Sequence, residues 1–76
     1  MPTFLEPGDQ DRLELLVLST GSSSIRLRAR LLLKFEEGLG ARDIAKQFDA
    51  PVNRVLHWRR TYLKLGLAMF DGTEEG

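Results

Sequence analysis

Apolar side chains recur at intervals of three and four residues along most of the chain, and this spacing predicts amphipathic helices. Serine, glycine and proline interrupt the pattern, and such residues are typical of turns between helices. We expect four helices, which begin near Asp9, Ile25, Ala41 and Pro51. The pattern therefore predicts an all-α fold, in which an additional N-terminal helix precedes a core of three helices.

Residues 41–60 predict two short helices joined by a tight turn. Ala45 lies on the inner face of the first helix, where a small side chain lets two helices cross closely. Asp49 and Ala50 form the turn with Pro51, which we place at the first helical position because a proline there loses no hydrogen bond. Two helices connected in this way form a helix-turn-helix, whose second helix enters the major groove of DNA.

The second of these helices has an apolar and a polar face when successive residues are placed about 100° apart. The face predicted to meet the core carries Val55, Trp58, Tyr62 and Leu65. The opposite face carries Asn53, His57, Arg60 and Lys64, with Leu56 at its margin. Residues 51–65 include no acid, whereas a face that needs only solubility more often mixes both charges. We therefore expect an anionic partner.

Basic residues gather in the middle of the chain, although eleven lysines and arginines balance eleven acids overall. Residues 23–66 contain ten basic and four acidic side chains, and both ends of the chain are acidic. Charges are screened over about 8 to 10 Å at physiological salt, so a phosphate near this segment responds to the local surplus. Zero net charge therefore does not exclude DNA as a partner.

The helix predicted for residues 25–37 has leucines on more than one side, so we place it at the centre of the fold. Arg26, Arg30 and Lys34 recur every four residues and form one basic line along it. This line is either a solvated face or a set of contacts to DNA phosphates. Gly38 ends the helix, because glycine readily adopts the left-handed conformation that follows a helix.

Both ends of the chain differ from the helical centre. Residues 1–8 contain two prolines and predict an irregular arm, residues 9–70 form the DNA-binding domain, and residues 71–76 predict a disordered acidic tail. Some apolar residues near the ends exceed what one packing face needs, so they are either buried in the domain or form a homodimer contact. These residues are Leu15 and Leu18 in the first helix, and Leu67, Met69 and Phe70 after the last.

Composition excludes several classes of protein. The chain has no cysteine and a single histidine, and this composition predicts neither a disulfide framework nor a zinc site. We therefore expect no metal or cofactor. No apolar run approaches the roughly 18 residues of a membrane span, and we expect a soluble, cytoplasmic protein. We do not expect an enzyme, because 76 residues leave little room for a cleft and His57 has no carboxylate or nucleophile on its helix face.

Five short segments carry a likeness to a known protein family. They are Arg28–Leu33, Glu37–Leu39, Arg42–Ala45, Val55–Arg60 and Gly66–Ala68, and the likeness extends over about residues 7–71. Together they resemble the homeodomain-like helix-turn-helix at the N-terminus of bacterial insertion-sequence transposases related to mariner elements. The most specific part is the order of Ala45, Val55 and Trp58, followed by Gly-Leu-Ala after the long helix.

The resemblance implies that the domain binds the terminal repeats of a mobile element. It places five side chains toward bases: Val52, Asn53, Leu56, His57 and Arg60. It places Arg42, Arg54 and Arg59 toward phosphates, and we add the outward-facing Lys46 and Lys64 to this group. Asparagine can bond two positions of an adenine at once, and arginine can do the same with a guanine.

The chain departs from the family pattern at two turn positions. Asp49 replaces the usual glycine, and aspartate tolerates a left-handed backbone better than most residues. Pro51 replaces a serine, which removes a hydroxyl and an amide that often hold a phosphate. The family's acidic catalytic domain would follow Gly76, so we do not expect the chain to transpose DNA by itself.

Two functions from different classes remain. The first is sequence-specific binding of double-stranded DNA, as a small transcriptional regulator or a stand-alone transposase-type module, with a second copy to extend the site. The second is a protein-interaction module that kept the three-helix scaffold and lost DNA binding, which zero net charge and Pro51 favour. Titration with duplex DNA at two salt concentrations separates them, because phosphate contacts give a steep salt dependence.

Overall fold

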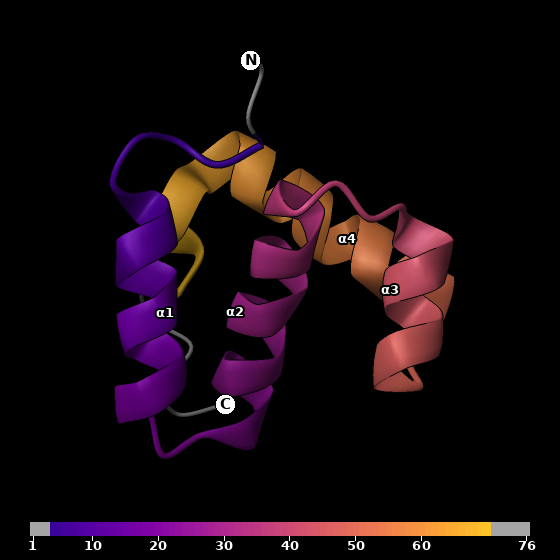
Figure 1. The fold of residues 1–76 in the computed structure, drawn as a ribbon, viewed down its shortest axis with the longest axis horizontal. Helices are drawn as coiled ribbons and strands as arrows, with labels where there is room; N and C mark the ends of the chain where they lie inside the picture. Colours follow the sequence, from indigo (N-terminus) through magenta and orange to yellow (C-terminus); the bar gives the residue numbers. More distant parts are fainter. Residues whose placement is uncertain (1–3, 71–76) are drawn as a thin grey trace.

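Four α-helices and a short 3₁₀ helix make up the part of the chain that the structure, a computed structural model, describes, residues 4–70. They are α1 (Asp9–Ser19), α2 (Ser23–Glu36), α3 (Ala41–Phe48), α4 (Val52–Leu65) and η1 (Gly66–Phe70). Helices α1 and α2 pack side by side and antiparallel, α3 lies on the far side of α2, and α4 crosses behind (Figure 1). The all-α prediction is confirmed.

Helix boundaries follow the residues that interrupt the apolar pattern. The side chain of Ser22 caps α2 by accepting a 3.2 Å hydrogen bond from the Ile25 N–H. Gly38, with φ +99°, lies just beyond the end of α2 as expected. Pro51 is the N-cap of α4 and has an extended backbone, with ψ 139°. The expectation that it occupies the first helical position is therefore wrong.

The core consists of two clusters of buried side chains, and α2 contributes to both. The first cluster joins α1, α2, α4 and η1 through Leu5, Leu13, Ala29, Leu32, Tyr62 and Met69. The second joins α2, α3 and α4 through Leu31, Ile44, Ala45 and Val55. Trp58 of α4 packs against both clusters. The central position predicted for α2 is confirmed, because its leucines point to two sides.

The irregular segment before α1 is part of the packed domain. Leu5 is buried, and its N–H donates a 2.7 Å hydrogen bond to a carboxylate oxygen of Glu36. The ring of Phe4 lies 5.3 Å from that of Phe35 and 5.2 Å from that of Tyr62. The domain therefore begins before residue 9, where the apolar pattern placed its boundary. Residues 1–3 and 71–76, including the predicted acidic tail, lie outside the described residues.

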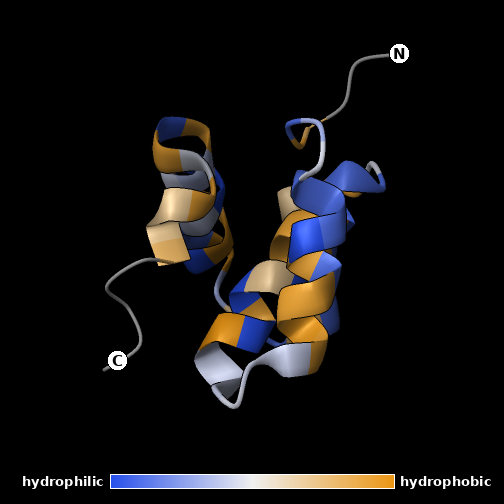
Figure 2. Ribbon diagram, turned by 90° about the vertical axis from the view of Figure 1, so that its left-hand side faces the viewer, coloured by the Kyte–Doolittle hydropathy of each residue, from blue (hydrophilic) through white to orange (hydrophobic). Residues whose placement is uncertain are grey.

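The residues of α1 are mostly hydrophilic over its first turns and mostly hydrophobic over its second half (Figure 2). Leu13 is fully buried, whereas Leu15 and Leu18 are 67% and 84% exposed. Met69 after α4 is buried in the first cluster, with Leu67 and Phe70 packed against it. The C-terminal apolar residues were predicted either to be buried in the domain or to form a homodimer contact. The structure shows that they pack within their own domain. None of the described helices is long and apolar enough to cross a lipid bilayer.

Candidate nucleic-acid interface

A left-handed residue makes the turn between α3 and α4. Asp49 has φ 54° and ψ 47°, and it is the only non-glycine residue with positive φ among residues 4–70. The N–H of Ala50 donates a 2.9 Å hydrogen bond to the carbonyl oxygen of Ala45 and closes the end of α3. The tolerance expected of aspartate at this position is confirmed. The turn fixes the direction in which α4 leaves α3.

Helix α4 has the two faces that its sequence predicts, with one exception. Val55 is fully buried and Tyr62 nearly so, while Trp58 is half-buried between the clusters. Leu65, expected in the core, is 51% exposed. Gly66 ends the helix directly after it, and η1 then folds onto the cluster around Tyr62, which leaves Leu65 outside. That part of the core-face prediction is wrong.

The five residues assigned to bases do not all project from α4 in the same way. Asn53, His57 and Arg60 are exposed on the outer face, and Leu56 is half-buried beside them. Val52 is also half-buried, but it packs against the second cluster and therefore turns toward α3. The ring centres of His57 and Trp58 lie 4.8 Å apart, with an angle of 69° between the ring planes. The outer face thus offers an amide, an imidazole and a guanidinium.

The basic side chains of α3 and α4 form no ion pair with the acids of residues 4–70. Those assigned to phosphates are all exposed: Arg42, Lys46, Arg54, Arg59 and Lys64. The ion pair within residues 4–70 is Lys34 with Glu37, at 3.6 Å on α2, so no carboxylate there neutralises the five. Arg59 also lies above the ring of Phe35, with its guanidinium carbon 5.8 Å from the ring centre. These charges are available to an external anion.

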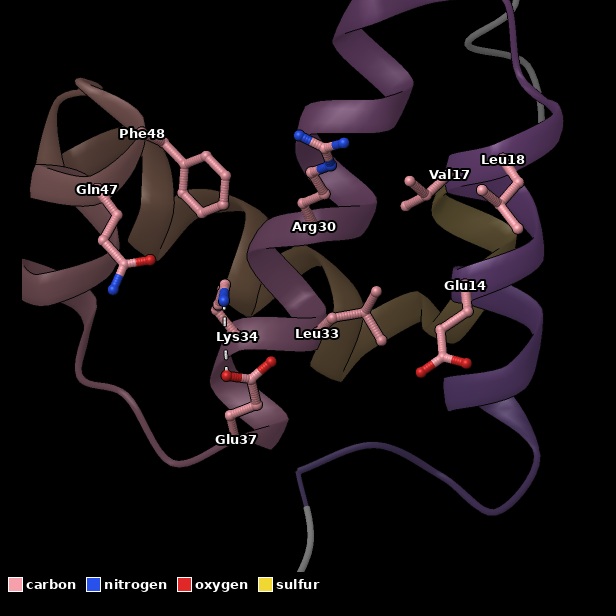
Figure 3. A pocket seen from close by; sticks show the side chains of 9 residues that line it. All are labelled: Glu14, Val17, Leu18, Arg30, Leu33, Lys34, Glu37, Gln47 and Phe48. Atoms are coloured by element: carbon pink, nitrogen blue, oxygen red, sulfur yellow. Dashed lines mark ion pairs between the residues drawn. The ribbon is translucent and has the colours of Figure 1, made fainter.

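The three residues of the basic line expected along α2 lie in different surroundings. Arg26 donates from Nε to the carbonyl of Val17 at 3.2 Å and from Nη2 to that of Thr20 at 2.8 Å, so its guanidinium caps the end of α1. Arg30 and Lys34 line a groove built from α1, α2 and α3, between Glu14 and Phe48 (Figure 3). The outer face of α4 does not contribute to this groove. Arg26 thus has partners within the domain, whereas Arg30 is exposed, and a phosphate contact from this line stays a prediction.

A basic residue of α2 that the sequence pattern did not single out contacts α4. The guanidinium carbon of Arg28 lies 3.8 Å from the ring centre of Trp58, in cation–π contact. Partial burial, and then the positive charge of Arg54, lower the pKa of Arg28 below its usual range. A signal was present in the sequence, because Arg28 occurs on the side of α2 that carries Ile25 and Leu32. A charged residue on an apolar face needs a specific partner.

Comparison with known protein families gives a match over most of the described residues. Residues 22–68 match a family model described as a homeodomain-like domain. The match covers α2, α3, α4 and the first residues of η1, which is more than half of the chain, and leaves α1 outside. Searches of curated proteins and of solved structures gave no match to this chain.

Proposed function

Because the chain belongs to the homeodomain-like family, we propose that it binds double-stranded DNA in a sequence-specific manner. In this proposal α4 enters the major groove and α3 lies across the backbone. One observation carries it: α4 exposes Asn53, His57 and Arg60 on a face without acids, while Val55 and Trp58 hold its other side in the core. The scaffold thus presents polar side chains on a rigid helix.

Asn53 and Arg60 are the residues that we assign to base recognition. Asparagine forms two hydrogen bonds with adenine and arginine two with guanine, and each such pair discriminates by about 1 to 3 kcal/mol. The surrounding exposed arginines and lysines supply the contacts to phosphates, which position the protein without reading sequence. Asn53 and Arg60 share α4 with three of these basic residues, and the other two, Arg42 and Lys46, lie on α3.

We further propose that the protein acts as a small transcriptional regulator or as a transposase-type DNA-binding module. The likeness of Val55–Arg60 and Gly66–Ala68 to mariner-related transposases supports the second form. A single domain contacts few base pairs, so two copies would lengthen the recognised site. The exposed Leu15 and Leu18 of α1 support a homodimer through this helix, whereas the buried Met69 is not available for it.

Titration of the protein with duplex DNA at two salt concentrations tests the proposal. We expect binding whose constant falls steeply as salt is raised, because phosphate contacts release counterions. Selection of bound sequences from random duplexes should then yield one consensus, and a palindrome would indicate a symmetric dimer. Absence of binding at low salt would overturn the proposal and favour a protein-interaction module on the same scaffold.

A further inference from the structure

We propose that Arg28 of α2 and Arg54 of α4 together bind a single phosphate of the DNA backbone, with the indole of Trp58 holding Arg28 in place. The two arginines line one hollow of about 260 Å³, which also includes Ser24 and Leu27. This inference rests on the proposed function and extends it, because it gives DNA contacts to a helix outside the helix-turn-helix. It also names the chemical group bound there, a phosphodiester.

Arg28 is positioned before any ligand arrives. Its guanidinium stacks on the face of Trp58 at 3.8 Å, and Trp58 is itself fixed between the two core clusters. A stacked guanidinium uses its flat face for the ring and keeps the N–H groups on its edge for acceptors. A planar fork of this kind fits two oxygens of a phosphate. Little side-chain freedom remains to be lost on binding.

The charges in the hollow favour an anion. Arg28 and Arg54 come from different helices, and neither forms an ion pair with a carboxylate in the described part of the chain. Their proximity is unfavourable, as the effect of Arg54 on the pKa of Arg28 indicates. A phosphate between them would replace this repulsion by two attractive contacts. The hydroxyl of Ser24, in the same hollow, offers a further donor.

The hollow adjoins the side chains assigned to bases. Arg54 and Trp58 are one helical turn apart on α4, next in sequence to Asn53 and His57. The contact between the rings of His57 and Trp58 links the hollow to the outer face. A phosphate held here would fix the depth and register of α4 in the groove, which is how backbone contacts support base recognition.

Binding of duplex DNA by the intact chain tests this inference over a series of salt concentrations. Arg28→Ala, Arg54→Ala and the double variant are compared with Arg12→Ala, which removes an exposed arginine of α1. We expect each single variant to weaken binding about tenfold or more. The double variant should lose less than the sum of the two effects, and its salt slope should fall by about 1, the value for one shared phosphate. Arg12→Ala should bind like the wild type.

A second measurement replaces one backbone phosphate at a time by a neutral methylphosphonate. Substitution at one particular phosphate should lower the affinity of the wild type, and the same substitution should not change the affinity of the double variant. If Arg28→Ala does not fold, Arg28→Lys and Arg54→Ala carry the test, since Lys keeps the charge but not the planar fork. If the variants of Arg28 and Arg54 bind DNA as tightly as Arg12→Ala, the shared phosphate site is overturned, whereas the proposed DNA binding is not. A wild type without salt-dependent DNA binding would overturn the proposed function as well.

Discussion

The phenol of Tyr62 donates a 2.6 Å hydrogen bond to the carboxylate of Asp9, 53 residues earlier in the chain. Its oxygen also accepts a 2.9 Å hydrogen bond from the N–H of Glu6. One side chain of α4 is thereby bonded both to the first turn of α1 and to the segment before it. The helix proposed to read DNA is held to the N-terminal part of the domain by polar contacts as well as by packing.

Replacing Tyr62 by Phe should lower the free energy of unfolding by about 1 to 2 kcal/mol at neutral pH, because two hydrogen bonds are lost while the ring remains. Urea denaturation followed by circular dichroism measures the change. Thr61→Ala, one residue earlier on the exposed side of α4, is the control and should have a smaller effect. Equal stability of Tyr62→Phe and the wild type would show that these bonds add nothing.

The difference in stability between the wild type and Tyr62→Phe should depend on pH. Burial, and then the hydrogen bond to Asp9, raise the pKa of Tyr62 to about 12. The unfolded chain loses the phenol proton near pH 10, so its contribution to stability is complete below pH 10 and fades as pH rises toward 12. The stability difference between the wild type and Tyr62→Phe should therefore shrink over this interval. A difference that stays constant from pH 9 to 12 would contradict the assignment.

Substitutions on α4 should separate base contacts from phosphate contacts. Asn53→Ala and Arg60→Ala should change which sequence is preferred, at a cost of about 1 to 3 kcal/mol on the best site. Arg59→Ala should weaken binding to all sequences alike and reduce the salt slope by about 1. Binding to a panel of duplexes that differ at single positions measures both effects. Uniform losses for all three variants would refute the division of roles.

The arginines of α2 should differ in what they stabilise. Arg26→Ala removes two hydrogen bonds to the end of α1 and should lower the free energy of unfolding by about 1 to 2 kcal/mol. Arg30 lies one turn along the same helix and its side chain is exposed, so Arg30→Ala should change the free energy of unfolding by less than about 0.5 kcal/mol. Thermal denaturation of the two variants makes the comparison. An equal loss would mean that the cap of α1 is not needed.

Leucines of α1 should likewise fall into two groups. Leu13→Ala should cost about 2 to 5 kcal/mol, because it leaves a cavity in the first cluster. Leu15→Ser with Leu18→Ser should leave the monomer stable, since both side chains are exposed, and should abolish any dimer formed through α1. Sedimentation at micromolar concentration, with and without DNA, measures the association. A wild type that is monomeric both with and without DNA would contradict the proposed homodimer.

Local signals in the sequence were sufficient for the helices and for most of the α4 face. The bounds of α3 and the left-handed turn at Asp49 could be predicted because residues only a few positions away determine them. The position of Leu65 could not, because periodicity tells which side of a helix a residue occupies but not whether another element covers it. Only the fold shows that η1 turns away from it.

Side chains that bridge distant segments were the other limit. Arg26 and Arg28 look equivalent as charges on one helix, yet one reaches the end of α1 and the other the ring of Trp58. The packing of Phe4 and Leu5 also depends on segments more than thirty residues away. Contacts of this kind depend on how the helices are arranged, and a helical repeat carries no information on that arrangement.

Trp58, the only tryptophan of the chain, belongs to the surroundings of both core clusters. Loss of either cluster would expose the same indole, so we expect the part of the domain around α1 and the helix-turn-helix to unfold together. Each cluster alone would be small for a stable core in a chain of 76 residues. We therefore expect the shared side chain to make the two halves a single cooperative folding unit.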